Sequence, residues 1–272
     1  MFYLLLALFG CVTGISAVLF GFGGGFVVVP LLYWMLLGSQ GADSAVGQSA
    51  MHVAVATSTC VMIVNALVAS RRHHQAGNLV RHYLWPLGGY IGLGAILGAA
   101  AAMWVSGEVL RYAFIAYLGI TVADCLLRRG FLEPSQGQEA RLLGARETLF
   151  GGVGIGVVAT FLGVGGSVMT VPLLRRCGLS MTQATAMANP LSVPVALAGT
   201  VTYMALAGFS SFDLGPWFVG YVDLLAFSVL TLGSLLGIRL ATSWIGRIPD
   251  RVHAWVYIGL LLLVLFSMCV KG

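Results

Sequence analysis

The stretch Leu19–Leu32, which reads LFGFGGGFVVVPLL, decides how the rest of this chain is interpreted. An otherwise almost purely apolar segment here contains four glycines: Gly21, Gly23, Gly24 and Gly25. Glycine weakens a helix interior by up to about 1 kcal/mol relative to alanine, because it loses the most conformational freedom on folding. The pattern therefore predicts an apolar helix that is interrupted at the glycines and begins again near Phe26.

The composition around this stretch is that of a membrane protein. Of the 272 residues, 59% are hydrophobic and 8% are charged, whereas a soluble domain is typically about 25% charged. Several apolar runs approach or exceed the roughly 20 residues that cross a bilayer. We therefore predict an integral multi-pass protein. Its basic residues lie in short loops between apolar runs, which is typical of a positive-inside bias and argues against nucleic-acid binding.

The sequence offers no residue set for enzyme chemistry. The five cysteines form no C-x-x-C pair and most lie in apolar runs, which predicts small buried side chains rather than a metal site. Neither a Ser/His/Asp set nor a pair of carboxylates occurs at a catalytic spacing. We therefore predict a protein that is not an enzyme and that uses no metal or cofactor.

The glycine motif occurs twice. Residues 21–32 read GFGGGFVVVPLL, and residues 163–174 read GVGGSVMTVPLL. Three glycines and the final VPLL match at a constant shift of 142 residues. An internal repeat of this kind predicts two homologous units.

Weaker matches extend the repeat. Asn65 aligns with Val195, and Gly94–Gly98 aligns with Gly233–Gly237. A charged stretch separates the two copies. We therefore predict three parts: a first transmembrane repeat over 1–127, a cytoplasmic linker over 128–146 and a second transmembrane repeat over 147–272.

The basic residues distinguish two topologies. If all eight apolar segments cross the membrane once, 8 basic residues face one side and 6 face the other. If the glycine-interrupted segments, about 3–37 and 147–176, are instead re-entrant, 12 face one side and only Arg111 and Lys271 face the other. The positive-inside rule favours the second topology and places the arginine face in the cytoplasm.

The predicted fold is thus an all-α integral membrane protein with two inverted-topology repeats. Each repeat consists of a re-entrant or broken helical hairpin plus three transmembrane helices. Because three crossings are an odd number, the second repeat is inverted relative to the first. Both termini are expected on the extracytoplasmic side of the cell inner membrane. Inverted repeats with broken helices that meet near the midplane are a recurring plan of transporters.

The two glycine motifs predict an anion site. Each opens a helix, whose N-terminus presents unpaired N–H groups and a partial positive charge. The predicted substrate-binding residues are Gly23, Gly24, Gly25, Gly165, Gly166 and Ser167 in the motifs, with Thr57, Ser58 and Asn189 on neighbouring segments. The alternatives are that the glycines only permit close helix packing and that the hydroxyls bond to their own backbone.

Two ionisable residues are candidates for a coupling proton. His52 and Asp223 are each expected about two turns into a membrane segment, where an ionisable side chain is a functional hypothesis by default. The alternative is that each lies near the outer interface, where it is wetted or hydrogen-bonded. By contrast, His73, His74 and His82 lie beside arginines in a loop and are predicted to be solvated rather than metal-binding.

The duplicated motif resembles the TauE/SafE family, also called sulfite exporter or TSUP proteins. Ala56–Ser58, the loop Arg72–Asn78 and Gly237–Ala241 add to the resemblance. It implies transport of sulfur-containing anions such as sulfite, sulfoacetate and related sulfonates, or of small organic acids. The chain departs from the family pattern at Ala188–Pro190, where a Thr-Ser pair is common, and at Ser167, which replaces a glycine. Both departures bear on the substrate more than on the fold.

The leading interpretation is a secondary transporter that exports a small anion by alternating access, with proton coupling as one option. Its expected partners are the anion and the lipid bilayer, without nucleic acid, and the oligomeric state is left open. One alternative is an anion channel lined by the same loops, and another is a transporter of a non-sulfur organic acid. The residues themselves predict an anion, and only the resemblance implies sulfur.

Overall fold

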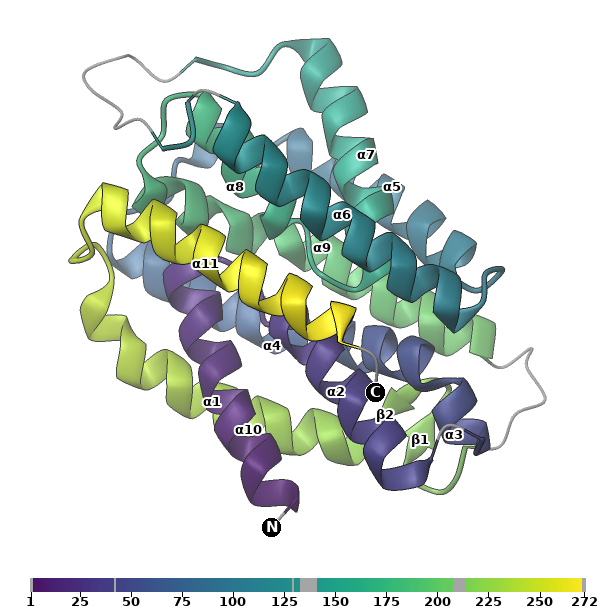
Figure 1. The fold of residues 1–272 in the computed structure, drawn as a ribbon. Coiled ribbons are helices and arrows are strands. Elements are labelled where there is room, and N and C mark those ends of the chain that lie inside the picture. Colours follow the sequence, from purple (N-terminus) through teal and green to yellow (C-terminus); the bar gives the residue numbers. More distant parts are fainter. Residues whose placement is uncertain (1, 42, 129, 133–140, 208–213, 271–272) are drawn as a thin grey trace.

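The computed structural model describes residues 2–41, 43–128, 130–132, 141–207 and 214–270. Within these ranges the chain folds into helices and one short β-hairpin (Figure 1). Arg129, Lys271 and much of the predicted linker lie outside the described residues. The elements are α1 (Phe2–Phe20), α2 (Gly25–Gln40), α3 (Ala45–Gln48), α4 (Ala50–Gln75), η1 (Arg81–Tyr83), α5 (Leu87–Ala102), α6 (Gly107–Leu127), α7 (Ala145–Leu162), α8 (Ser167–Arg176), α9 (Met181–Ala207), β1 (Phe218–Val219), β2 (Val222–Asp223), α10 (Leu224–Ala241), η2 (Thr242–Trp244) and α11 (Asp250–Cys269).

Seven helical segments of the described chain are long and apolar enough to cross a membrane, by length and composition. They are α4, η1 with α5, α6, α7, α9, α10 with η2, and α11. Shorter apolar helices flank the first glycine motif, at residues 4–20 and 25–39. The predicted all-α membrane architecture is confirmed at this level.

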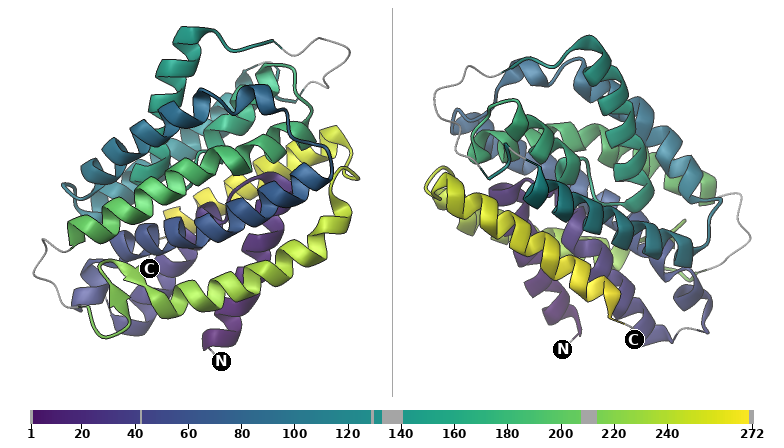
Figure 2. Two further views of the ribbon diagram at one scale, coloured as in Figure 1. Left: turned by 180° about the vertical axis from the view of Figure 1, so that it is seen from behind. Right: turned by 45° about the horizontal axis from the view of Figure 1, so that its top comes forward.

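Helices α4 and α9 form the centre of the molecule. In each, 67% of the most apolar window is buried, against 33–39% in the other candidate spans. They pack against each other, and Figures 1 and 2 show them running between α1 and α10 on one side and α5, α6 and α7 on the other. Any site between α4 and α9 is therefore shielded from lipid by the outer helices.

Helices α1 and α10 approach each other backbone to backbone. A Cβ atom placed on Gly14 would lie 2.0 Å from the Ser234 carbonyl oxygen, and one placed on Gly237 would lie 2.0 Å from the Cys11 carbonyl oxygen. Neither position can hold a larger residue without separating the helices. Small residues spaced four apart allow this kind of packing between membrane helices.

Helices α5 and α7 use the same device. A Cβ atom on Gly98 would lie 2.2 Å from the Val157 carbonyl oxygen, and one on Gly156 would lie 2.0 Å from the Ile91 carbonyl oxygen. The glycine pair Gly94 and Gly98 of α5 aligns in sequence with Gly233 and Gly237 of α10, and both pairs allow close helix packing. Each fits its helix against the helix that precedes the glycine motif of the opposite half.

The loops that contain most arginines gather at one end of the molecule, here called the arginine-rich end. The backbone N–H of Arg141 donates to the Cys177 carbonyl oxygen (2.8 Å), which places the approach to α7 beside the end of α8. Arg176 pairs with Asp124 of α6 (2.5 Å), and Arg175 pairs with Asp250 of α11. At the other end, Arg111 donates to the carbonyl oxygens of Met268, in the last turn of α11, and of Val270, which follows it.

One predicted segment is wrong in part. Asp223 is expected about two turns into a membrane segment, the apolar run 216–243, but the first residues of this run form the antiparallel hairpin β1–β2. Gly215 and Gly220 have φ angles of 114° and 61°, which a helix excludes. Helix α10 therefore begins only at Leu224, directly after Asp223.

Candidate functional site

The first glycine motif forms a tight loop between α1 and α2. Helix α1 ends at Phe20 and α2 begins at Gly25. Between them Gly21, Gly23 and Gly24 have φ angles of 73°, 61° and 93°, a left-handed conformation that residues with a Cβ atom rarely adopt. The predicted interruption is therefore present, and the new helix begins within one residue of the predicted position.

The second motif forms a similar loop between α7 and α8, which begins at Ser167. Gly163 and Gly165 have φ angles of 67° and 72°. Gly166 differs from its counterpart Gly24, because its φ angle of −69° lies in the ordinary helical region. The two loops thus share their outline but not every backbone conformation.

The two loops touch each other. A Cβ atom placed on Gly25 would lie only 2.6 Å from the Gly163 carbonyl oxygen. The side chain of Met62, from α4, contacts both loops: a Cβ atom on Gly23 would lie 3.0 Å from its Cγ, and one on Gly165 would lie 2.5 Å from its Sδ. The two glycine loops therefore lie against each other and against Met62.

Both loops are sealed inside the protein. Every residue from 21 to 26 and from 163 to 168 is buried. Ser192 of α9 also reaches both loops, since its Oγ would lie 3.4 Å from a Cβ atom on Gly165 and its Cβ would lie 3.7 Å from one on Gly23. Irregular backbone at membrane depth is tolerated only where protein or water surrounds it, and α4 and α9 provide that surrounding.

Two polar side chains of α4 lie against the loops. The hydroxyl of Ser58 donates to the Gly163 carbonyl oxygen (2.9 Å). Asn65 lies against the first loop, because a Cβ atom on Gly24 would be 2.2 Å from its Nδ2. The Oδ1 of Asn65 accepts a hydrogen bond from Ser234 of α10, which fixes the amide orientation.

Several buried polar atoms near the loops have no hydrogen-bond partner within the described residues. They are Asn65 Nδ2, Ser167 Oγ, Thr170 Oγ1 and Asn189 Oδ1, and all four residues are 0% exposed. The first three lie in or against the loops, and Asn189 lies on α9, where its Nδ2 donates to the Thr185 carbonyl oxygen (3.4 Å). Buried polar groups are nearly always paired in folded proteins. Their accumulation here is what a site for a polar guest requires.

The positive character of this region comes from the backbone. Helices α2 and α8 both begin at the loops, and each helix N-terminus carries a partial positive charge. The arginines of α8 lie at its other end, where Arg175 pairs with Asp250 and Arg176 with Asp124. An anion between the loops would therefore meet amide and hydroxyl donors rather than a guanidinium group.

Two predicted residues are used at the start of α10. Thr57 is buried, and its Oγ1 accepts a hydrogen bond from the backbone N–H of Asp223 (3.0 Å). The Asp223 carboxylate accepts from the N–H groups of Leu225 and Ala226 (3.0 and 2.9 Å), so it caps the helix. The expectation that Asp223 lies two turns into a membrane helix is wrong, because the β-hairpin delays the helix start.

His52 is also placed differently from the prediction. It lies in the first turn of α4, which begins at Ala50, and not two turns into the helix. Its Nε2 lies 3.3 Å from the carbonyl oxygen of Ala102 and 3.2 Å from that of Val105. This contact ties the start of α4 to the loop between α5 and α6.

Sequence reasoning missed three residues that touch the loops: Met62, Asn65 and Ser192. Asn65 carried a usable signal, because an amide in the middle of an apolar helix needs a partner. Ser192 stood among other polar residues of α9 with nothing to single it out. Met62 carried none, since methionine is an ordinary filler of apolar cores.

The helix ends that precede the loops are held by side chains from other helices. His73 Nε2 lies 2.7 Å from the Val18 carbonyl oxygen, and His253 Nε2 lies 2.8 Å from the Leu19 carbonyl oxygen. The prediction that His73 is solvated is wrong, because it is 1% exposed. Helix α4 continues to Gln75 and carries His73 past the end of α1.

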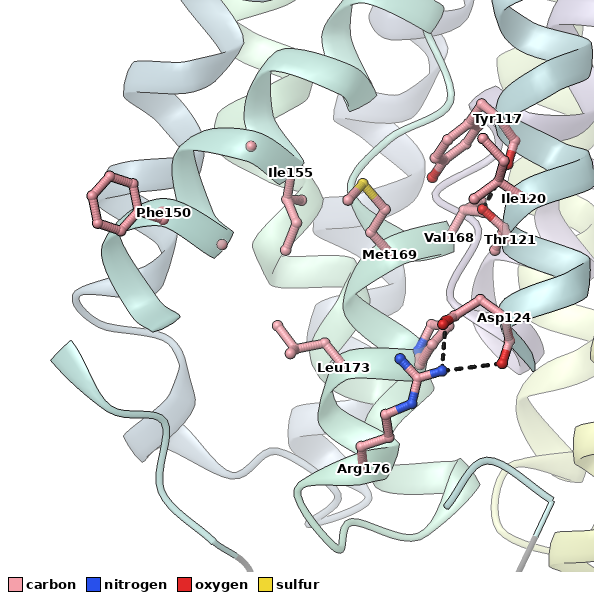
Figure 3. A pocket seen from close by; sticks show the side chains of 13 residues that line it. Tyr117, Ile120, Thr121, Asp124, Phe150, Ile155, Val168, Met169, Leu173 and Arg176 are labelled. Atoms are coloured by element: carbon pink, nitrogen blue, oxygen red, sulfur yellow. Dashed lines mark hydrogen bonds and ion pairs between the residues drawn. The ribbon is translucent and has the colours of Figure 1, made fainter. Parts of the chain in front are cut away.

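Two apolar grooves border the helices that follow the loops. One, of about 380 Å³, lies between α6, α7 and α8 and reaches from Val168 to the Arg176–Asp124 pair (Figure 3). The other, of about 350 Å³, lies between α1, α2 and α11. There Trp34 Nε1 donates to the Ser267 carbonyl oxygen (2.9 Å) in place of an ion pair.

The whole-chain similarity can now be set beside this geometry. A family model described as "Sulfite exporter TauE/SafE" matches residues 6–268. The chain belongs to the TauE/SafE family. It is 24% identical over 273 residues to a "Probable membrane transporter protein" of Haemophilus influenzae, covering 99% of each chain. It is 23% identical to proteins of the same description from Methanocaldococcus jannaschii (74% of this chain and 72% of that one) and Xylella fastidiosa (94% and 92%).

No solved structure matches the chain. Membership of the TauE/SafE family makes it a multi-pass membrane transporter and not an enzyme, as the sequence predicted.

Proposed function

We propose that this TauE/SafE protein is a secondary transporter that binds a small anion between its two glycine loops and carries it by alternating access. The contact of Gly25 with Gly163 is the observation that carries the proposal. It brings the N-termini of α2 and α8 together, and helix N-termini are ready-made anion sites. The loop residues Gly23–Gly25 and Gly165–Ser167 would supply the amide donors.

Side chains around the loops complete the proposed site. Asn65, Ser167 and Thr170 carry polar atoms without a partner in the described chain, and each can donate to an anion. Ser58 and Asn189 remain candidates from the sequence, since both are buried on the central helices. Proton coupling through His52 or Asp223 stays a prediction, and the hydrogen bonds of both side chains support a structural role first.

Alternating access is supported by burial and by cross-packing. The loops are closed off from solvent, which suits an occluded state of a carrier better than an open pore. Helix α1 packs along α10, and α7 packs along α5. In each pair, the helix before one glycine loop packs against a helix of the other half. Two inverted repeats, 1–127 and 147–272 joined by the 128–146 linker, would produce this cross-packing. We place the arginine-rich end in the cytoplasm and both termini outside.

The proposed cargo is sulfite or an organosulfonate, and the proposed direction is export. The family description supports sulfur, whereas the donors at the loops would accept any small oxyanion, including a non-sulfur organic acid. Specific recognition depends on how many oxygens the loops can bond, because each donor left unpaired by the wrong anion weakens binding.

A thermal-shift panel on purified protein tests the site. Sulfite, sulfate, thiosulfate, sulfoacetate, methanesulfonate and acetate would each be added over a concentration series, with sodium and potassium chloride as controls. We expect at least one oxyanion to raise the Tm in a saturable way. A response to none of them would overturn the anion site. Unitary currents in planar bilayers would instead favour a channel.

A further inference from the structure

The last turn of α1 depends on two imidazoles. The Gly21 N–H bonds to the Ala17 carbonyl oxygen (3.1 Å), as in a regular helix. In a continuous helix the next two carbonyls, of Val18 and Leu19, would accept from residues four positions later. The glycine loop turns the chain away at that point. His73 and His253 take over these two acceptors, from α4 and α11.

The hydrogen bonds show which nitrogen of each ring carries a hydrogen when the ring is neutral. A carbonyl oxygen can only accept, so each Nε2 must carry a hydrogen. In a neutral imidazole the Nδ1 then holds a free lone pair. Both Nδ1 atoms are buried without a partner in the part of the chain that the structure describes, and the residues are 1% and 3% exposed. Nδ1 is therefore the atom at which either ring would take up a proton.

The two rings share one small cavity. Its volume is about 10 Å³, close to the space of a single water molecule. Besides His73 and His253, it is lined by Val18 and Leu19, by Thr182 and Thr185 of α9, and by Trp244, Ile245, Gly246 and Ile248 before α11. The segment 244–248 belongs to the arginine-rich end, so a proton would reach the pair from that side.

The surroundings contain few competing charges. Arg175 of α8 and Asp250 of α11 act electrostatically on His253, but they pair with each other. Asp250 also accepts from the Met181 N–H (2.7 Å) at the start of α9. Helices α1 and α9 line the cavity with apolar side chains and threonines. Arg247 is not among the lining residues, although it lies between Gly246 and Ile248, which are. On α4 the neighbours of His73 in sequence are Arg72 and His74.

In the second half of the chain, a tyrosine rather than a histidine bonds to the last turn of the helix before the loop. Tyr203 aligns with His73 in the register that pairs Asn65 with Val195. Its hydroxyl donates to the Thr160 carbonyl oxygen (3.2 Å), and Thr160 corresponds to Val18. A phenol can donate this bond but has no nitrogen that binds a proton near neutral pH. Among the described residues, the groups shown to hold the helix before a loop are therefore titratable near neutral pH at the first loop and not at the second.

We propose that His73 and His253 bind one proton together with each transported anion. The proposal rests on the proposed function. A proton on Nδ1 leaves the Nε2 bond intact and adds a positive charge at the C-terminal end of α1, where the helix dipole favours a cation. That charge stabilises an anion at the adjacent loop. A second proton is disfavoured because it would place two imidazolium rings around one cavity.

Methanesulfonate, a monoanion at every pH used, tests the coupling in the wild-type protein. Calorimetry in buffers of different ionisation enthalpy measures protons taken up per anion bound, between pH 5.5 and 8. We expect uptake of close to one proton and an affinity that falls by up to about tenfold per pH unit on the alkaline side. Binding with no proton uptake and no pH dependence would overturn the coupling while leaving the anion site intact.

The double variant H73Q/H253Q identifies the groups responsible, because glutamine can place an N–H near the Nε2 position and cannot take up the proton. We expect methanesulfonate affinity that no longer changes with pH. A variant that keeps the wild-type pH profile would rule out this pair. Should the variant not fold, imidazole NMR of the wild type with and without saturating methanesulfonate replaces it: the rings should be neutral without the anion and take up one proton with it, and two rings that stay neutral with the anion bound would contradict the proposal. Wild-type protein that binds none of the panel anions would overturn the proposed function and the coupling with it.

Discussion

The two glycine loops have the same outline, yet the helix before each loop is held differently. At the first loop, His73 and His253 hold the carbonyls of Val18 and Leu19. At the second loop, the Tyr203 hydroxyl holds the carbonyl of Thr160. Two loops of similar backbone geometry thus differ, within the described residues, in whether the group that holds the preceding helix is titratable near neutral pH.

The grooves beside the two loops differ in the same way. The groove along α8 ends at the Arg176–Asp124 ion pair (Figure 3), whereas the matching groove along α2 ends at the neutral bond between Trp34 and Ser267. The charged version lies at the arginine-rich end. The Trp34 bond lies at the other end, where the Trp34 ring packs against the Arg111 guanidinium.

The largest expected difference between the loops is at the third of their matching glycines, Gly24 and Gly166. Gly24→Ala should lower the free energy of unfolding by at least about 1–2 kcal/mol and abolish anion binding, because its φ is 93° and a Cβ atom would strike Asn65. Gly166→Ala should stay within about 1 kcal/mol, because its φ is −69° and the nearest atom, the Ile155 Cγ2 at 3.2 Å, needs to move only slightly. Thermal unfolding in detergent measures both, and equal losses would mean that the loops are not distinct.

The hydroxyl of Ser167 distinguishes a binding role from a packing role. Ser167→Ala should reduce anion affinity about tenfold or more, since a hydrogen bond to a charged group is lost, but it should not lower the Tm, because the hydroxyl has no partner in the described protein. Ser16→Ala is the matched control, a buried serine whose hydroxyl bonds to the Thr13 carbonyl within its own helix. Unchanged affinity in both variants would show that the second loop is only structural.

Tyr203→Phe tests whether the hydrogen bond that holds the helix before the second loop is purely structural. Loss of its bond to Thr160 should reduce stability by about 1 kcal/mol, partly compensated because the Gly163 N–H also donates to that carbonyl (3.2 Å). The pH dependence of methanesulfonate binding should remain that of the wild type. A changed pH profile would show that the second loop also senses protons.

The smallest effect is expected in the grooves. Asp124→Asn removes a partly exposed ion pair and should lower stability by about 0.5–1 kcal/mol, with a smaller difference at high salt. Ser267→Ala at the matching position should change nothing measurable, because Trp34 bonds to the backbone oxygen of Ser267. Chemical denaturation at two ionic strengths compares them, and a salt-independent loss in Asp124→Asn would contradict the assignment.

Sequence reasoning located the two loops because their signal is local. Glycines repeated before the same VPLL mark helix breaks whatever surrounds them. Both breaks are present, and the helix after the first begins within one residue of the predicted Phe26. The residues around the loops were harder to find, because which face of α4 meets a loop depends on how the helices cross. Asn65 and Met62 lie on that face, whereas Thr57 points to the start of α10.

Two errors share a physical cause, which is that element boundaries are set by tertiary contacts. His73 sits between Arg72 and His74 and looks solvated in sequence, but α4 extends beyond its apolar run and buries it. Asp223 sits inside an apolar run, but the hairpin before it turns it into a helix cap. Neither the burial of His73 nor the capping role of Asp223 can be predicted from the local amino-acid composition.

The most direct test of the central claim is a structure with selenite bound, in which the anomalous signal of selenium locates the anion. We predict a single peak between the two loops, within hydrogen-bonding distance of the N–H groups that begin α2 and α8 and of the Ser167 hydroxyl. A peak only at Arg176 or Arg111, with the loops empty, would contradict the account.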